Sequence, residues 1–442
     1  MKTATTLPAT SLSLVAPSAN SPFDRDAPTA RMYLSSRTKS AVAVSTITGL
    51  ANDITDLRGN RKTASAEYHL ALGAMVAELA RAASHSPPLG CYRPLRASDF
   101  PSGGIGYRPF NRALNDMIRH GYVTTGGGES AWRERLGSVT RIYVTPKLTD
   151  YLSVHGITVA DREKHFQYKP AMDDIPPVQL RATLDKDRGK PRRGKKLKVD
   201  TANPVVAGHV NQIRRINEYV HRQTVIGPKQ DRLDIALYRG FNLGDAPGHN
   251  YTKGGRVYAA YQSFERADRD HITINGLSTI EVDISACFLT IVHYLLKRPF
   301  SGKNDPYAGP SIHRDIVKAW VNLTIGYGQY HTRWPQEAID RLEEKGHNNV
   351  RKTHPIASVK EEVLTNIPIV GEWVESIYTW ADLFFIESQI VIRTIERLAF
   401  EYNVPCLPIH DAVRVPVKQV VLAKEVLRES FSHYTGLMPI VA

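Results

Sequence analysis

The chain of 442 residues is too long for one typical domain, and two or three domains with hydrophobic cores are expected. Its 57 basic and 44 acidic residues give a net charge of +13, which favours nucleic acid over a membrane surface as partner, although a generic basic protein would share it. Three widely spaced cysteines argue against a disulfide framework or a zinc site and fit a reducing cytoplasm, and no stretch approaches a membrane span.

The N-terminal part divides into a tail and a small domain. Residues 1–60 are rich in Ser, Thr and Ala and are predicted to be a flexible tail without a secretory signal. Within residues 61–160, apolar spacing predicts helices over Ser65–Ala83 and Tyr107–Val123, the second of them stopped at Gly121. A short strand, glycines 126–128 and a second strand over Ser138–Leu148 follow.

Two helices followed by a glycine-tipped pair of strands is the order of a winged helix-turn-helix. Residues 61–160 resemble winged-helix DNA-binding domains such as those of plasmid replication initiators. The resemblance implies DNA contacts by Arg108, Arg112 and Arg119, on or beside the recognition helix, and by Arg141 on the wing. The alternative is a small α+β packing domain without DNA contact.

Residues 161–203 are predicted to be a basic linker. They contain "DKDRGKPRRGKKLK" (residues 185–198), whose charge, glycines and proline indicate a solvated segment able to contact phosphates. A plain charged linker fits equally well. We expect a domain boundary here, with a second domain over residues 204–442.

Two acidic side chains in the second domain lie at the ends of predicted strands. "HITING" and "STIEVDIS" predict a hairpin around Asn275-Gly276, and Asp283 lies where its second strand runs into a helix. "VPCLPIHDAVRVP" (Val404–Pro416) predicts a buried hairpin with Asp411 in its turn. A carboxylate in such a place is costly unless it is paired or holds a metal. If the fold brings the two aspartates together, they suit Mg²⁺, or Mn²⁺, in a two-metal centre for displacement at phosphorus.

Four segments in this domain resemble, in their order, those of family A nucleic-acid polymerases, the bacterial DNA polymerase I type. They are "TKGGRVYAAYQSF", similar to the Thr-Gly-Arg segment; "VDISACFLTIVH", the first catalytic segment; "HRDIVKAWVNLTIGYG", the fingers helix; and "LPIHDAVRVP", the last catalytic segment. The resemblance implies an α+β right-hand polymerase fold, with palm, fingers and an antiparallel sheet. It also implies an enzyme, a nucleotidyltransferase that adds dNTPs to a primer 3′ end on DNA by two-metal-ion catalysis.

The resemblance implies roles for the residues of this chain that match the family segments. It implies that Asp283 and Asp411 are catalytic and hold the metal together with the Ile284 backbone carbonyl. The implied nucleotide-binding residues are Arg314, Lys318, Tyr327 and Phe288. The implied primer-template residues are Arg256, Gln262, Asn322, Gly328, Glu387, Gln389 and His410.

Some of these roles have alternatives. Arg314 and Lys318, four apart on a helix, share a face that can grip a triphosphate or can simply be solvated. Phe288 lies where the family contacts the incoming sugar, so its ring would favour deoxynucleotides, unless it is a core aromatic. The polar residue facing the primer-template is either Glu387 or Gln389, and His410 contacts the primer-terminal phosphate or is structural.

The sequence also departs from the family. Ala412 replaces the usual acidic residue, the step from Lys318 to Asn322 is one residue longer than usual, and no proofreading exonuclease set is evident. A thumb would have to come from about residues 205–250 or be replaced. A primase or template-independent terminal transferase, a catalytically silent replication initiator and a metal-dependent nuclease therefore stay open.

The expected partners are a DNA primer-template, dNTPs and replication proteins of the host or of a plasmid, phage or mobile element, but no membrane. The expected location is the cytoplasm, in association with the nucleoid.

Overall fold

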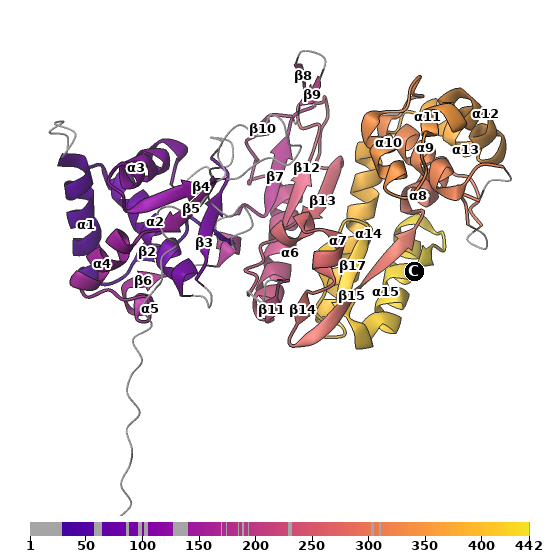
Figure 1. The fold of residues 1–442 in the computed structure, drawn as a ribbon. Coiled ribbons are helices and arrows are strands. Elements are labelled where there is room, and N and C mark those ends of the chain that lie inside the picture. The colour runs from indigo at the N-terminus through magenta and orange to yellow at the C-terminus, as the bar shows by residue number, and fades with distance from the viewer. Residues whose placement is uncertain are drawn as a thin grey trace, which may run out of the picture. The chain divides into compact units, whose positions relative to one another are not determined.

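The computed structural model describes residues 29–56, 64–84, 88–95, 100, 105–126, 140–168, 170–173, 175–183, 185–187, 190–192, 194–228, 232–301, 305–308 and 311–441. The chain forms two compact units, Met1–Asp174 and Ile175–Ala442, hereafter unit 1 and unit 2. Both mix helices with mainly antiparallel sheets, which confirms the expected α+β class (Figure 1). In the described part of the chain, no helix combines the length and apolarity needed to cross a membrane.

Unit 1 packs helices against a four-stranded sheet of order β1-β3-β5-β4. The strands are β1 (Thr29–Arg31), β3 (Gly90–Arg93), β4 (Val123–Gly126) and β5 (Thr140–Val144). The helices are α1 (Ala41–Asp56), α2 (Ala66–Ala83), α3 (Tyr107–Arg119), α4 (Pro146–Val154) and α5 (Arg162–His165). A second pair of strands, β2 (Arg37–Thr38) and β6 (Phe166–Gln167), joins the two ends of the unit.

The predicted helices and hairpin of residues 61–160 are present, with shifted ends. Ser65 caps α2 by accepting from the Tyr68 amide at 3.2 Å. Helix α3 ends at Arg119, just before Gly121 with φ of 70°. Strand β5 stops before Pro146, which begins α4, and Gly127 and Gly128 lie outside the described residues. Strand β3, which pairs antiparallel with β5, was not predicted.

The prediction of a flexible tail over residues 1–60 is wrong for residues 29–56, which form β1, β2 and α1. In α1, Ala43, Ile47, Leu50 and Ile54 recur at three- or four-residue steps and are buried. The small polar residues between them gave the segment a tail-like composition and hid this spacing. The rest of the predicted tail, residues 1–28 and 57–60, lies outside the described residues.

Unit 2 has two main sheets. The first has the order β10-β7-β12-β13, with strands β7 (Val178–Arg181), β10 (Lys196–Leu197), β12 (Tyr238–Phe241) and β13 (Gly254–Tyr258). The second has the order β11-β14-β15-β17-β16, with strands β11 (Val225–Ile226), β14 (Thr273–Ile274), β15 (Leu277–Ser285), β16 (Leu407–Ile409) and β17 (Ala412–Pro416), and β18 (Ile440–Val441) also pairs with β15.

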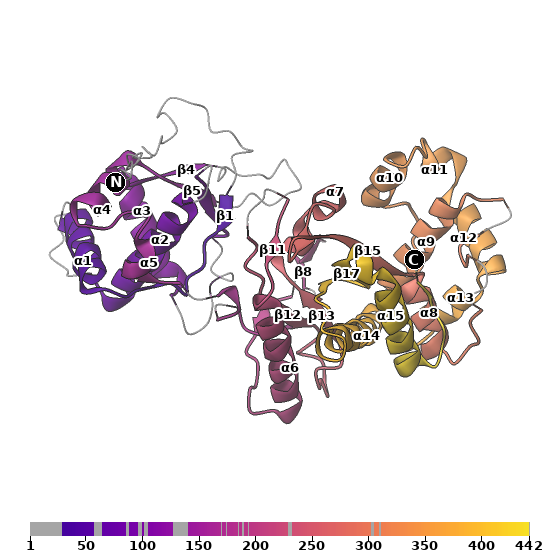
Figure 2. The ribbon, with the colours of Figure 1, turned by 90° about the horizontal axis from the view of Figure 1, so that it is seen from below.

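The helices of unit 2 surround these sheets. The longer ones are α6 (Pro204–His221), α8 (Cys287–Leu295), α9 (Arg314–Tyr327), α10 (Gln336–Glu343), α12 (Ile356–Asn366), α13 (Ile369–Val374), α14 (Trp380–Phe400) and α15 (Val420–Thr435). The short ones are α7 (Arg266–Arg269) and α11 (Val350–Thr353). Helix α14 packs on β13, α8 and α15, and α9 to α13 gather beyond the end of β15 that leads into α8 (Figures 1 and 2).

The structure differs from the predicted linker over residues 161–203. Residues 162–167 form α5 and β6 of unit 1, and β7 and β10 belong to the first sheet of unit 2. Val178 and Leu180 alternate along β7 and are buried, so this strand belongs to a core. Within the basic segment, β8 (Asp185–Asp187) pairs with β9 (Lys190–Arg192) as a hairpin. The two units meet in sequence at residues 174 and 175 rather than at 203.

Candidate functional site

Asp283 and Asp411 are brought together by the pairing of β15 with β17. In this antiparallel pair Asp283 lies opposite Ala412, and Asp411 is the residue just before Ala412. Opposite residues of such a pair have Cα atoms about 4.5–5.5 Å apart. Two carboxylates 128 positions apart in the sequence (411 − 283) therefore become neighbours.

The alternation of β15 decides which way its side chains point. Val282 and Ile284 are buried in the core, whereas Glu281 and Asp283 lie on the other face of the sheet. Glu281 is bound there by two arginines, Arg269 at 2.7 Å and Arg414 at 2.9 Å. Asp283, two residues further along, has no arginine partner among the described residues, so the polar face ends in a carboxylate close to Asp411.

A residue with a left-handed backbone lies three positions after Asp283, and another lies directly before Asp411. Ala286, between β15 and α8, and His410, in the turn between β16 and β17, each have φ of 54°. A residue other than glycine in this backbone conformation costs on the order of 1 kcal/mol. The surrounding fold holds both sharp turns, and such strain is concentrated at functional sites in proteins.

The electrostatics of the two carboxylates reflect burial and mutual repulsion. Burial of the carboxyl group, and then the Asp411 charge, raise the pKa of Asp283 to about 6, although the residue as a whole is exposed. Burial likewise raises the pKa of Asp411. The positive charge of Lys318 acts in the opposite direction and lowers the pKa of both aspartates. Among the residues that the structure describes, neither carboxylate forms an ion pair within 4.0 Å. Two neighbouring carboxylates of this kind are chemically suited to a divalent cation.

A buried ion pair lies behind the aspartates. Arg256 of β13 donates from Nη2 to Glu387 Oε2 of α14 at 2.5 Å, and Glu387 is fully buried. The guanidinium carbon lies 3.6 Å from the centre of the Phe384 ring and 5.3 Å from that of Phe288. Burial raises the pKa of Glu387 to about 7, with Arg256 opposing and Asp411 adding to the shift. In this structure the Glu387 carboxylate is therefore enclosed by protein and holds Arg256.

Two consecutive glycines prepare the backbone for Arg256. Gly254 and Gly255 have φ of 78° and 81°, and the register of β12 and β13 shifts between Gly240 and Phe241, which leaves Gly255 as the extra residue of a bulge. A Cβ on Gly255 would lie 2.9 Å from Arg239 Nη2. The Gly-Gly-Arg pattern in the sequence thus has a local cause that is independent of any resemblance.

The start of α9 presents the basic side chains predicted to bind nucleotide. Arg314 forms an ion pair with Asp305, and Lys318 acts electrostatically on the carboxylates of Asp283 and Asp411. Between them lies the buried ring of Tyr307, 5.7 Å from the Arg314 guanidinium carbon and 5.9 Å from Lys318 Nζ. Tyr307 was missed in the sequence because the loop before α9 carries no motif.

The other predicted nucleotide and template residues on or near α9 differ in their surroundings. Phe288 stacks on Phe384 with ring centres 5.6 Å apart and is half-buried, so it takes part in an aromatic cluster. Tyr327 is 57% exposed at the end of α9, and Asn322 is exposed on the same helix. Gly328 ends α9 with φ of 66°.

Three predicted primer-template residues have different environments. Gln262 donates to the Val257 and Pro408 carbonyls, at 3.1 and 2.8 Å, and so braces the strand that leads into the Asp411 turn. Gln389 accepts from Arg239 at 2.9 Å, away from the aspartates. His410 lies in the turn beside Asp411, with its pKa lowered by burial and then by Arg256.

The backbone of Ile284 lies between the candidate site and β18. Its amide donates to the Asp283 carboxylate, and the residue pairs with Val441. The predicted metal-ligating role belongs to its carbonyl, which lies in the same strand as Asp283 and one residue further on.

In unit 1, three of the four predicted DNA-binding arginines share one surface. Arg108, Arg112 and Arg119 of α3 line a hollow of about 530 Å³ together with Tyr107, Asn111, Asn115 and Ile118. The Arg112 guanidinium also stacks over Tyr68 at 5.4 Å. Arg141 lies on β5, opposite Tyr92 and Gly126.

No protein-family model matches the chain, and no curated protein has a significantly similar sequence.

Replacing Asp283 by Asn is expected to stabilise the metal-free protein. The pKa of Asp283 is raised from 3.8 to about 6 in the folded state, so the folded protein binds this proton more tightly than the unfolded chain, and stability falls as pH rises through that range. Asp283→Asn should therefore raise the free energy of unfolding at pH 8 by on the order of 1 kcal/mol, after allowance for solvent screening.

The measurement is urea unfolding with a chelator at pH 8 and pH 4. Most of the gain should disappear at pH 4, because the folded-state carboxyl, whose pKa is about 6, is then protonated and no longer carries the buried charge. Asp270→Asn is the matched control, because Arg414 lowers the pKa of Asp270 and its loss should not stabilise. An Asp283→Asn protein less stable than the parent at pH 8 would contradict the argument.

Removal of Arg256 should destabilise the protein more strongly as pH rises. In Arg256→Met, Glu387 stays buried without its partner, and its pKa, already about 7, rises further. At pH 6 the Glu387 side chain is then neutral and can stay buried without a partner. At pH 9 it is charged, and an unpaired buried charge lowers the free energy of unfolding by about 3–5 kcal/mol. Urea unfolding across this range gives the difference, and the double variant Arg256→Met with Glu387→Gln should lose the pH dependence. A cost independent of pH in the single variant would exclude this account.

Proposed function

We propose that unit 2 is a nucleotidyltransferase that resembles family A polymerases and adds dNTPs to a primer 3′ end on a DNA template. The observation that carries this proposal is the register of β15 and β17, which makes Asp283 and Asp411 neighbours. Each lies in a segment that resembles a catalytic segment of that family, and the palm and fingers interpretation follows from the same order of segments.

Mg²⁺, with Mn²⁺ as substitute, is the cofactor of this proposal. The fit rests on two carboxylates that have raised pKa values and, among the described residues, no ion pair of their own. Hard carboxylate oxygens are the ligands that Mg²⁺ prefers, and the Ile284 carbonyl would add a third oxygen. When bound, the metal lowers the pKa of the attacking hydroxyl and stabilises charge on the triphosphate.

The chain's own residues have distinct tasks in this scheme. Lys318 is already attracted to the aspartates, and it would bind the triphosphate together with Arg314 once Arg314 leaves Asp305. Arg256, fixed by Glu387 and the Phe384 ring, would hold the primer-template near Asp411. Phe288 would border the sugar of the incoming nucleotide.

Unit 1 is proposed to bind duplex DNA as a winged-helix domain. The support is the antiparallel pairing of β4 with β5 after α2 and α3, together with the arginine-lined hollow on α3. An exposed helix with several arginines on one face suits phosphate contacts in a groove. We further propose that the protein acts in replication of a plasmid, phage or mobile element, in association with the nucleoid.

The decisive test is incorporation of labelled nucleotides on a primed DNA template with Mg²⁺ or Mn²⁺. Asp283→Asn and Asp411→Asn should each reduce incorporation to the level without protein, because each removes a metal-binding charge. Duplex binding measured in parallel should be unchanged. Asp268→Asn, an exposed acidic residue of α7, is the control that should keep activity.

Further reactions in the same assay separate the alternatives. Extension with NTPs or without a primer would favour a primase, and extension without template a terminal transferase. Strand degradation without nucleotides would favour a nuclease. DNA binding with no incorporation under any condition would leave a silent replication initiator. Incorporation that persists in either aspartate variant would remove the assignment.

The α3 surface can be tested by the salt dependence of DNA binding. Each phosphate contact contributes about 0.9 to the slope of log affinity against log salt. Arg112→Ala should weaken duplex binding and reduce this slope by about one contact, and the triple variant with Arg108→Ala and Arg119→Ala by up to about three. Fluorescence anisotropy at several salt concentrations measures both. Lys164→Ala, an exposed cation on α5, should leave them unchanged; equal losses in this control would mean that the binding is not localised to α3.

A further inference from the structure

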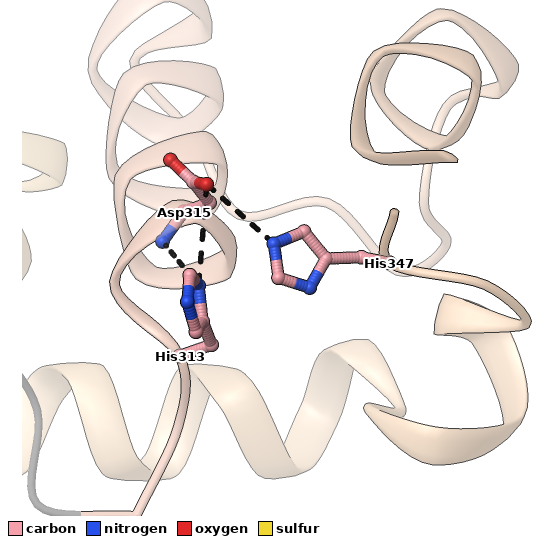
Figure 3. A group of neighbouring side chains, drawn as sticks. All are labelled: His313, Asp315 and His347. Atoms are coloured by element: carbon pink, nitrogen blue, oxygen red, sulfur yellow. Dashed lines mark hydrogen bonds and ion pairs between the residues drawn. The ribbon is translucent and has the colours of Figure 1, made fainter. Parts of the chain in front are cut away.

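We propose that His313, Asp315 and His347 form a second metal site, for a first-row transition ion such as Zn²⁺. His313 and Asp315 lie at the start of α9, and His347 lies in the segment between α10 and α11 (Figure 3). Each residue offers one ligand atom, and the three atoms lie within 4.8 Å of one another. The inference does not rest on the proposed polymerase activity.

The distances between the ligand atoms are close to those around a bound ion. Asp315 Oδ2 lies 3.5 Å from His347 Nε2 and 4.0 Å from His313 Nδ1. Ligands about 2.0–2.2 Å from a tetrahedral zinc are about 3.3–3.6 Å apart. The His313 side chain is 59% exposed, which leaves it room to rotate toward the other two ligands. The fourth position would be left to water.

The carboxylate of Asp315 is oriented for this role by a second partner. Its Oδ1 accepts from Lys345 Nζ at 2.9 Å, which leaves Oδ2 directed at the two imidazoles, as Figure 3 shows. Partners of this kind fix ligand orientation at many metal sites. The ammonium group also competes with a cation for Asp315, so we expect an exchangeable ion.

The other contacts of the histidines are compatible with binding. The two rings lie with centres 4.5 Å apart. His313 Nδ1 accepts from the Asp315 amide at 3.2 Å as the cap of α9, and coordination at this nitrogen would replace that bond. Losing a cap costs about 1 kcal/mol, which a metal–nitrogen bond offsets.

The ligand set selects the type of ion. Two imidazoles and one carboxylate suit Zn²⁺ and its neighbours, whereas Mg²⁺ prefers oxygen ligands throughout. The site is therefore chemically distinct from the Asp283 and Asp411 pair. The cysteine count predicted that zinc was absent, but this cluster needs no cysteine. A bound ion would fasten the residues after α10 to the start of α9, the helix that carries Lys318.

The test uses the full chain without a histidine tag, with Asp283→Asn and Asp411→Asn introduced so that the other carboxylate pair cannot bind the ion. After chelation and dialysis, Co²⁺ is added and its visible absorption recorded, and Zn²⁺ is titrated by calorimetry. We expect one Zn²⁺ per chain, tetrahedral Co²⁺ bands and a higher melting temperature with Zn²⁺.

His347→Ala should weaken Zn²⁺ binding by at least about 10-fold, whereas His347→Cys, which restores a zinc ligand, should keep it. His354→Ala, a histidine of the same region outside the cluster, is the matched control and should bind like the parent. Because the other two ligands lie at the start of α9, where His313 is the cap, a melting curve of each variant without metal checks folding. Absence of stoichiometric Zn²⁺ binding, or binding unaffected by His347→Ala, overturns the proposal, whatever the outcome of the incorporation assay.

Discussion

The antiparallel register of β15 and β17 is the constraint on which the candidate site in unit 2 depends. It sets Asp283 opposite Ala412 and so fixes the distance between two carboxylates that no local interaction links. A shift by one residue would turn Asp283 into the core and Val282 out of it, because strand side chains alternate with a period of two. Burial of Val282 and of Val413 opposite it therefore specifies the register. The packing of the apolar face of β15 and β17 thus sets the positions of the aspartates.

This arrangement has costs that the surrounding structure offsets. Two carboxylates repel each other, and Ala286 and His410 hold left-handed backbones beside them. Behind them, the charge of Arg256 is balanced by Glu387, which is buried and keeps a raised pKa. Relieving the carboxylate repulsion or the left-handed backbones would favour folding locally, whereas removing Arg256 would leave Glu387 buried and unpaired. Such a balance of stability against reactivity is common at active sites.

The sequence predicted local features well and long-range ones unevenly. Alternation and the Asn275-Gly276 turn predicted β14 and β15, and apolar spacing predicted α2 and α3. The meeting of Asp283 and Asp411 followed only from the resemblance, since neither strand specifies its partner. Strand β3, the burial of residues 29–56 and the role of Tyr307 were missed, because each depends on contacts with distant residues that composition does not encode. The basic stretch of residues 185–198 masked β10, which lies inside it, and β7, which precedes it and pairs with β12 far along the chain.

Helix α9 shows why the arrangement in the structure does not oppose nucleotide binding. The ion pair of Arg314 with Asp305 is half-exposed, and such surface pairs contribute only about 0–1 kcal/mol. A triphosphate with a higher charge can therefore take Arg314 from Asp305 at little cost. Lys318 needs no release, because its attraction to the aspartates weakens once a divalent cation neutralises them. If the carboxylates bind a cation and α9 a nucleotide, as proposed, the cation would free a basic side chain for the substrate, and the two binding events would reinforce each other through α9.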